Sequence, residues 1–336
     1  MDQGQNFTIK NTFCGFLAGH TGAVSSIVTG HSSGDGKNNN ILISGSRDKT
    51  LLIWKLNTDL ERNTTESFGD PYIALTGHNN FVSDLSLSTD NNFLISSSWD
   101  NSLRLWNLKS GKCIKRFSVN DKNSILSATF ANDNRQIFSC GTDNKVSLWN
   151  TQGKLMMSST TGNHLDWISK VRNSPSAKNK FYATVGWDGR LKIWTDFLKI
   201  QTSIKAHEGP ANALAINTNG LYIATGGKDQ TVKLWKINEL NEPVKVYKTD
   251  SPVNDVAFNP ELQWVAAATD NLIYIWDISN DFDGPIQTIK AEPKKTKIQG
   301  EPKFTTLAWS SSGKYLFCGA TDGLIRVQQI EISESS

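Results

Sequence analysis

The sequence has few cysteines and no long apolar run. Its four cysteines, Cys14, Cys113, Cys140 and Cys318, are far apart and form no C-x-x-C pair. We therefore expect neither a zinc site nor a disulfide framework, and a reducing cytoplasmic environment fits best. No segment approaches the roughly 20 apolar residues of a membrane span, and the first residues do not form a signal peptide. The sequence predicts a protein that is neither secreted nor embedded in a membrane.

Strong charge of one sign is also missing. Lysine and arginine number 35 against 32 aspartates and glutamates, which gives a net charge of +3. This balance excludes a wholly basic nucleic-acid-binding chain, although it permits a local basic patch. The sequence has no Gly-rich phosphate loop, metal-binding cluster or unrepeated nucleophile and base. We therefore predict a protein that is not an enzyme and that needs no cofactor, metal or small-molecule substrate.

Tryptophan is abundant, and its spacing reveals a repeat. Six of the 11 tryptophans follow an aspartate by six residues, and the phrase recurs every 41 to 52 residues. A seventh phrase has Asp322 but carries Gln328 in place of the tryptophan. The six pairs are Asp48/Trp54, Asp100/Trp106, Asp143/Trp149, Asp188/Trp194, Asp229/Trp235 and Asp270/Trp276. Repeats of this length and signature are typical of four-stranded propeller blades.

The repeat predicts one closed all-β domain over residues 1–336. Short apolar or alternating runs between turn residues indicate four antiparallel strands in each unit. One blade cannot bury both faces of its sheet, so seven blades must stack in a closed ring. Residues 12–19 are predicted to complete the seventh blade, because only eight residues follow Gln328. The predicted blades cover approximately 20–77, 78–119, 120–161, 162–206, 207–249, 250–290 and 291–336.

Four of the units combine a histidine, a hydroxyl residue, the turn aspartate and the tryptophan. A single Ser/His/Asp set would suggest a hydrolase triad. Here the sets recur in register with the blades, so we interpret them as structural hydrogen-bond chains that satisfy buried polar groups. The sets are His20, Ser44, Asp48 and Trp54; His78, Ser96, Asp100 and Trp106; His164, Thr184, Asp188 and Trp194; and His207, Thr225, Asp229 and Trp235.

These phrases resemble the WD-repeat family, and the order and spacing of several strings are similar to the receptor-for-activated-C-kinase family within it. Those strings include ISGSRDKTLLIWKL, SSWDNSLRLWNL, VGWDGRLKIW and IATGGKDQTVKLW. The resemblance implies a cytoplasmic, seven-bladed WD-repeat scaffold on the head of the small (40S) ribosomal subunit near the mRNA exit. Its implied partners are 18S rRNA, neighbouring ribosomal proteins, protein kinase C-like kinases and other signalling or translation factors.

The resemblance also implies a ribosome contact at the first turn. The matching phrase is Ser46-Arg47-Asp48-Lys49-Thr50, so Arg47 and Lys49 are the expected rRNA contacts. Two cations on one exposed turn can bind adjacent phosphates, arginine in a bidentate manner and lysine as a point charge. Arg104 and other basic residues of the first two blades are weaker candidates for the same contact.

The residue before each turn aspartate is expected to project from one rim of the ring. At this position Trp99, Trp187 and Lys228 are candidates for protein contact, because large exposed aromatics are enriched at binding hot spots. Phe81 and Trp167 belong to the same rim by register. Blades three and six lack the histidine, and blade seven lacks both the histidine and the tryptophan. The alternative function is a generic WD-repeat subunit that docks a peptide on its rim in another complex.

Overall fold

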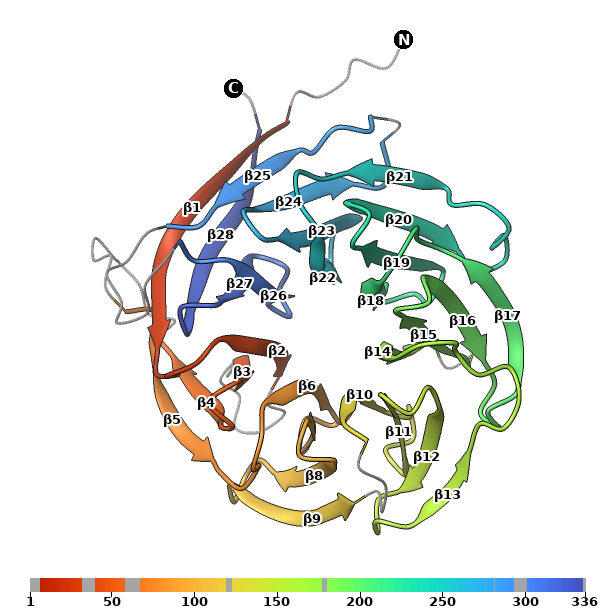
Figure 1. Cartoon of the computed structure of the whole chain (residues 1–336). Coiled ribbons are helices and arrows are strands. Elements are labelled where there is room, and N and C mark those ends of the chain that lie inside the picture. The colour runs from red at the N-terminus through yellow and green to blue at the C-terminus, as the bar shows by residue number, and fades with distance from the viewer. Residues whose placement is uncertain are drawn as a thin grey trace.

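The computed structural model describes residues 7–31, 40–57, 67–118, 123–176, 180–280, 282–292 and 301–334, and these ranges contain only strands, turns and loops. The strands form seven four-stranded antiparallel sheets, arranged as blades around a ring (Figure 1). No helix in the described ranges is long and apolar enough to cross a membrane. The predicted seven-bladed β-propeller is confirmed.

In the first six blades the strands follow one another from the ring centre outward. Blade one contains β2 (Val24–His31), β3 (Asn40–Ser46), β4 (Leu51–Leu56) and β5 (Gly69–Leu75). Blade two contains β6 (Val82–Leu87), β7 (Phe93–Ser98), β8 (Ser102–Asn107) and β9 (Lys112–Ser118). Blade three contains β10 (Ile125–Phe130), β11 (Gln136–Gly141), β12 (Val146–Asn150) and β13 (Leu155–Ser158). Blade four contains β14 (Ile168–Asn173), β15 (Tyr182–Gly186), β16 (Arg190–Trp194) and β17 (Ile200–Lys205).

The remaining blades complete the ring. Blade five contains β18 (Ala211–Ile216), β19 (Tyr222–Gly227), β20 (Thr231–Lys236) and β21 (Lys245–Lys248). Blade six contains β22 (Val253–Phe258), β23 (Trp264–Thr269), β24 (Leu272–Asp277) and β25 (Gln287–Lys290). Blade seven contains β26 (Phe304–Trp309), β27 (Tyr315–Ala320), β28 (Leu324–Glu334) and, from the other end of the chain, β1 (Phe7–Ala18).

The hydrophobic core is divided among the blade interfaces. Each of seven buried clusters joins two neighbouring blades, and the last one joins blade seven to blade one through Leu17, Phe317 and Ile325. This follows from the strand pattern, because both faces of each sheet carry apolar side chains and need a neighbour on each side. Every blade therefore depends on the closure of the ring.

Strand β1 closes the ring by pairing antiparallel with β28, from Phe7 opposite Glu334 to Ala18 opposite Leu324. The strand predicted at 12–19 thus exists but begins earlier, at Phe7, because β28 also extends beyond Gln328. A bulge between Phe13 and Gly15 interrupts the pairing, and Gly15 has φ of 138°. A glycine adopts this backbone without the penalty that a side chain would bring.

Candidate functional site

The four predicted histidine sets each form a continuous hydrogen-bond chain. The aspartate lies 2.8–2.9 Å from the histidine Nδ1, and the hydroxyl lies 2.7–2.8 Å from Nε2. The tryptophan Nε1 donates to the same hydroxyl at 2.8–3.0 Å. The chain links β3 or its equivalent to the following turn and strand, so it ties the inner half of the blade to its rim.

The bonds of each set fit a neutral histidine. The ionised aspartate can only accept, so Nδ1–H donates to it, and on a neutral ring Nε2 then accepts from the hydroxyl, whose oxygen accepts from the indole. Burial lowers the pKa of His78 and His164 below their usual value, against the opposing effect of their aspartates. Burial alone would raise the pKa of Asp48, but the hydrogen bonds from His20 and Thr50 hold it well below its usual range. In the sets of His78 and His164, a neutral histidine beside an ionised aspartate is therefore the stable pair.

These sets have the order of atoms found in a hydrolase triad, but they are closed to substrate. The hydroxyl residues Ser44, Ser96, Thr184 and Thr225 are all 0% exposed. Each hydroxyl proton is committed to the histidine, and each oxygen also accepts from the indole. A nucleophile must reach a substrate carbonyl, and none of these oxygens can. Within the described ranges no three His, Cys, Asp or Glu side chains gather to hold a metal ion.

Two of the three irregular blades replace the missing histidine, and each does so in a different way. In blade seven Arg326 binds Asp322 through Nη2 at 2.7 Å and is fully buried. In blade six Asp270 is held by Lys303 at 2.7 Å and by Asn254 at 3.0 Å. In blade three Ser139 still accepts from the indole of Trp149 at 2.9 Å. The pattern of histidines alone did not predict these substitutes.

A recurring cation near the turn aspartate was not predicted from the sequence. Four blades carry lysine or arginine four residues after the turn aspartate, and each binds a main-chain carbonyl at the start of its own blade. The bonds run from Arg104 to Gly77, from Lys192 to Gly162 and Asn163, from Lys233 to Ala206 and from Arg326 to Glu292. Its regular offset was the signal that could have revealed it. Arg104 is thus engaged inside blade two, and its guanidinium also lies over the ring of Trp106.

Arg47 and Lys49 are exposed on the first rim turn. The Arg47 amide donates to Ala23 at 2.9 Å, and the Lys49 amide donates to Ser46 at 3.2 Å, so the backbone of the turn is held from both sides. Lys49 has φ of 74°, in the left-handed region. Asn101 and Asn144 hold the same position in blades two and three, and asparagine tolerates this conformation better than lysine. The backbone conformation of this turn therefore gives no reason for a lysine at position 49.

The other predicted rim residues repeat this geometry in three more blades. The Trp99 amide donates to Phe81 at 3.0 Å, the Trp187 amide to Trp167 at 2.8 Å, and the Lys228 amide to Pro210 at 2.8 Å. The structure brings the four aromatic residues together and leaves Lys228 apart from them in blade five. In blade six the register breaks, because Thr269 is buried and its hydroxyl bonds Asp250 and Leu272.

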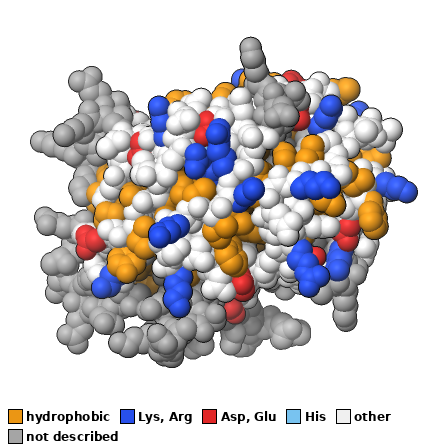
Figure 2. Space-filling model, turned by 90° about the horizontal axis from the view of Figure 1, so that it is seen from below, with side chains coloured by type: hydrophobic (Ala, Val, Ile, Leu, Met, Phe, Trp, Pro, Cys, Tyr) orange, Lys and Arg blue, Asp and Glu red, His pale blue; other side chains and the backbone are white. Residues whose placement is uncertain are grey.

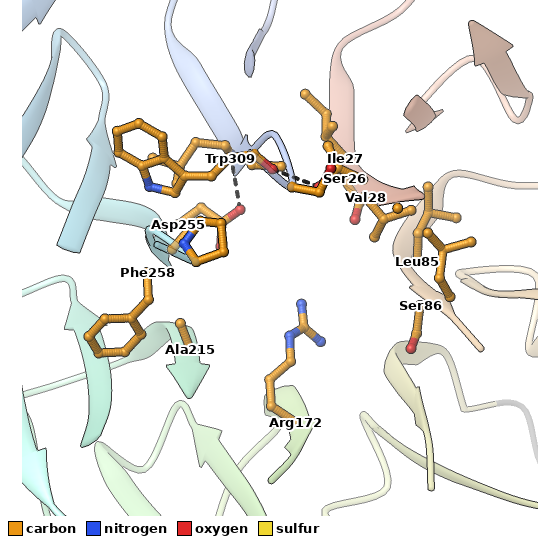
Figure 3. Close-up of a pocket in the computed structure, with 18 of the residues that line it drawn as sticks. Ser26, Ile27, Val28, Leu85, Ser86, Arg172, Ala215, Asp255, Phe258 and Trp309 are labelled. Atoms are coloured by element: carbon orange, nitrogen blue, oxygen red, sulfur yellow. Dashed lines mark hydrogen bonds between the residues drawn. The ribbon is translucent and has the colours of Figure 1, made fainter. Parts of the chain in front are cut away.

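The centre of the ring holds a cavity of about 650 Å³, which is lined by the inner strands (Figure 3). Arg172 of β14 points into it, and Asp255 of β22 lies on the opposite side. Arg172 forms a 2.7 Å ion pair with Asp84, which also accepts from Lys170 at 3.1 Å. Asp255 accepts from Thr306 at 2.8 Å and from the Leu307 amide. The charges around the channel are therefore satisfied by the protein.

Comparison with known proteins matches the chain to a family model described as WD domain, G-beta repeat. The matches cover residues 11–55, 69–107, 111–150, 157–195, 198–236, 241–277 and 292–327. The chain is 38% identical to "Small ribosomal subunit protein RACK1" of Caenorhabditis elegans over 325 residues, which are 96% of this chain and 97% of the relative. It is 38% identical to "Cross-pathway control WD-repeat protein 2" of Flammulina velutipes, over 94% and 96% of the two chains. It is 40% identical to "MST50-interacting protein 11" of Pyricularia oryzae, over 93% and 95%.

Proposed function

The chain belongs to the WD-repeat family, as a protein of the RACK1 type, and on this premise we propose that it is a non-catalytic scaffold bound to the small ribosomal subunit. The contact would be on the head of the subunit near the mRNA exit, in the cytoplasm. The name of the Caenorhabditis elegans relative supports the ribosomal part of this proposal. The buried hydroxyls of the histidine sets support its non-catalytic part.

The observation that carries the proposal is the pair of exposed cations at the first rim turn. Arg47 and Lys49 are exposed, and neither takes part in an ion pair among those found in the described ranges. Lys49 also keeps a left-handed backbone that asparagine would adopt more easily. Exposed cations on a hydrogen-bonded turn are suited to the phosphates of folded rRNA, because phosphate contacts fix position without reading sequence. Arg104 is not part of the proposed contact, since its guanidinium serves its own blade.

The outer wall of blade two could extend this contact. Lys112, Lys115 and Arg116 of β9 are all exposed. Figure 2 shows the wall on which β9 lies, with many Lys and Arg side chains and few Asp and Glu. Such a surface attracts a polyanion, and its effect weakens with salt. We therefore expect rRNA docking to be sensitive to salt beyond what two residues would produce.

Protein partners need a surface that remains free when the first turn is on rRNA. We propose the rim of blade five for signalling kinases and translation factors, with the exposed Lys228 as the candidate contact. The proposed linkage of kinases to the ribosome depends on this second surface.

The test is sedimentation of cell extract on a sucrose gradient with charge-reversal variants. The protein with Arg47→Asp and Lys49→Glu should move from the small-subunit fractions to the top, because each lost phosphate contact weakens docking. Lys228→Glu is the matched control, since Lys228 occupies the position of Arg47 in blade five, and it should sediment like wild type. Circular dichroism should show the same fold for all three proteins.

Two outcomes would contradict the proposal. If wild type stays at the top of the gradient at low salt, the chain is a WD-repeat subunit of another complex that docks peptides on its rim. If all variants sediment with the small subunit, the ribosome contact does not involve the first turn. The milder Lys49→Asn variant should weaken docking without disturbing the fold, because asparagine holds this position in two other blades.

A further inference from the structure

Four aromatic side chains, three of them exposed and Trp167 half-buried, lie close together along the rim and form an aromatic track. Phe81, Trp99 and Trp187 are 41%, 38% and 40% exposed, respectively. Trp99 packs edge-on against Trp167 with ring centroids 6.2 Å apart, and Trp167 lies 4.6 Å from Trp187 at an interplanar angle of 32°. The Trp99 amide donates to the main-chain carbonyl of Phe81, so Phe81 lies next to the three tryptophans. None of these four rings belongs to a histidine set, so the hydrogen-bond chains inside the blades do not explain why aromatic residues occupy these positions.

Cations lie at both ends of this aromatic track. The guanidinium of Arg47 lies 5.8 Å from the centre of the Phe81 ring, and Lys49 is two residues further along the same turn. At the other end Arg190 follows Trp187 by three residues; it is half-buried, and its Nη1 donates to Ser203 at 3.4 Å. Between the two ends, Lys145 is exposed on the rim turn of blade three. The nearby Asp166 carboxylate accepts the Trp167 amide at 2.7 Å. The turn aspartates of blades one, two and four are nearly buried and bonded to histidines.

We propose that this aromatic track binds single-stranded RNA, with bases stacked on Phe81, Trp99 and Trp187 and phosphates on Arg47, Lys49, Lys145 and Arg190. Exposed aromatics interleaved with cations are the usual platform for single strands, because every base offers a π-face and every nucleotide a phosphate. Stacking of this kind tolerates any base, so we expect the site to bind single strands without a preference for sequence. The bound strand follows the rim over blades one to four.

RNA fits the aromatic track better than a peptide for two reasons. The cations Arg47 and Lys49, proposed above for rRNA phosphates, lie directly against its first ring, so the track continues a phosphate-binding surface. The inference rests on the proposed function in this respect. In addition, cations on the turns of blades one, three and four accompany the rings of blades two and four, and surfaces that bind single strands combine aromatic rings with cations in this way. Lys228, remote from the track in blade five, stays with the proposed protein contacts.

The test measures binding of a fluorescent decauridine RNA to the purified protein, by fluorescence anisotropy and by quenching of tryptophan emission. Wild type should bind, and Trp187→Ala should weaken binding about fivefold or more, as expected for one lost base stack. Trp187→Tyr should bind within about threefold of wild type, because a tyrosine ring still stacks. Leu165→Ala is the matched control, since Leu165 is 81% exposed beside Trp167 but has no ring, and it should bind like wild type.

The salt dependence separates stacking from simple attraction. Trp187→Ala should leave the slope of affinity against salt concentration unchanged, whereas Arg190→Gln should reduce it by about one phosphate contact. Equal binding by wild type and Trp187→Ala would overturn the proposal and leave only a basic surface. Absence of decauridine binding at low salt would also overturn it. Displacement of the RNA by an acidic aromatic peptide at lower concentrations than by unlabelled decauridine would assign the track to a protein partner.

Failure here and failure of ribosome docking remain distinguishable. The RNA assay uses free protein with Arg47 and Lys49 intact, and the gradient assay uses variants of those two residues. Trp187→Ala should still sediment with small subunits, because the first turn is unchanged. Loss of decauridine binding with normal sedimentation would therefore be a result about the aromatic track alone.

Discussion

At the scale of single residues, the hydroxyl at the centre of each histidine set is the atom that two buried side chains share as their hydrogen-bond partner. Ser96 Oγ accepts from Trp106 at 2.9 Å and lies 2.7 Å from His78 Nε2, all in a buried site. Ser96→Ala leaves both groups unpaired and should lower the free energy of unfolding by about 2 to 4 kcal/mol, because a buried polar group without a partner costs about 1 to 3 kcal/mol. Urea denaturation followed by tryptophan fluorescence measures the change.

Ser96→Thr provides the matched control for this prediction. Threonine occupies the same position in blades four and five, where Thr184 and Thr225 make the same two bonds. The Ser96→Thr protein should therefore stay within about 1 kcal/mol of wild type. Equal destabilisation by alanine and threonine would mean that side-chain volume, and not the hydrogen-bond chain, determines the stability of this site.

The histidines also predict how stability depends on pH. Burial lowers the pKa of His78 and His164 below 6.5, so the unfolded chain takes up protons that the folded chain refuses. Stability should be complete above pH 6.5 and should fall as the pH drops, by up to about 1.4 kcal/mol per pH unit for each such histidine. Denaturation curves at pH 7.5 and 5.5 measure this loss. His78→Gln should show a smaller loss between the two pH values, and equal losses would contradict the assignment.

Residue chemistry could be read from the sequence only where the pattern repeats with one residue type. The structure brings together the side chains of the four sets that spacing had grouped, because spacing along strands determines which side chains meet across a blade. Arg326 and Lys303 were missed, since each replaces a histidine from a different place in the chain. The clustering of Trp99 with Trp167 was also missed, because it joins blades two and four across blade three.

At the scale of the strand, β1 is the element on which closure depends. Its Leu17 is fully buried between blades seven and one, and its backbone covers the edge of β28. Deleting residues 1–18 should expose that edge and part of an interface cluster, so blade seven should detach and the protein should associate. Sedimentation velocity should show larger species, with weakened near-ultraviolet circular dichroism. A deletion of residues 1–6 keeps β1 whole and should remain like wild type.

The number and order of strands followed from the sequence, whereas their ends did not. Alternating runs between turn residues indicated four strands per blade, and the closing strand was expected from the lack of residues after Gln328. The start of β1 at Phe7 was not expected, because residues 7–11 gain their partners only from the extension of β28. Strand ends that are determined by pairing across the chain termini have no local signal.

At the scale of the whole molecule, blades two and four are joined directly across blade three. On the rim Trp99 packs against Trp167. Near the central cavity, Asp84 of β6 forms ion pairs with Lys170 and Arg172 of β14. Ser127 of β10, in the intervening blade, donates to Asp84, and the Val171 amide donates to Ser127 at 3.1 Å. Blade three lacks the histidine of the regular sets, and its internal hydrogen-bond chain is therefore incomplete. The contacts between blades two and four span this blade and stabilise its position in the ring.

Asp84 should therefore carry more stability than its single position suggests. Burial alone would raise its pKa, but Arg172 and Lys170 hold the pKa well below its usual range, so the carboxylate stays ionised at neutral pH. Asp84→Asn leaves the two cations Lys170 and Arg172 without this counter-charge and should lower the free energy of unfolding by about 3 kcal/mol or more.

Asp255→Asn is the matched control, because Asp255 accepts hydrogen bonds from Thr306 and Leu307 and no ion pair was found for it in the described ranges. It should cost about 1 kcal/mol. If the two variants were equally unstable in urea, the ion pairs would contribute nothing beyond hydrogen bonding. If Asp84→Asn alone unfolds early, and hydrogen exchange rises first in β10 and β14, the bridge between blades two and four is what keeps the ring rigid at its irregular blade.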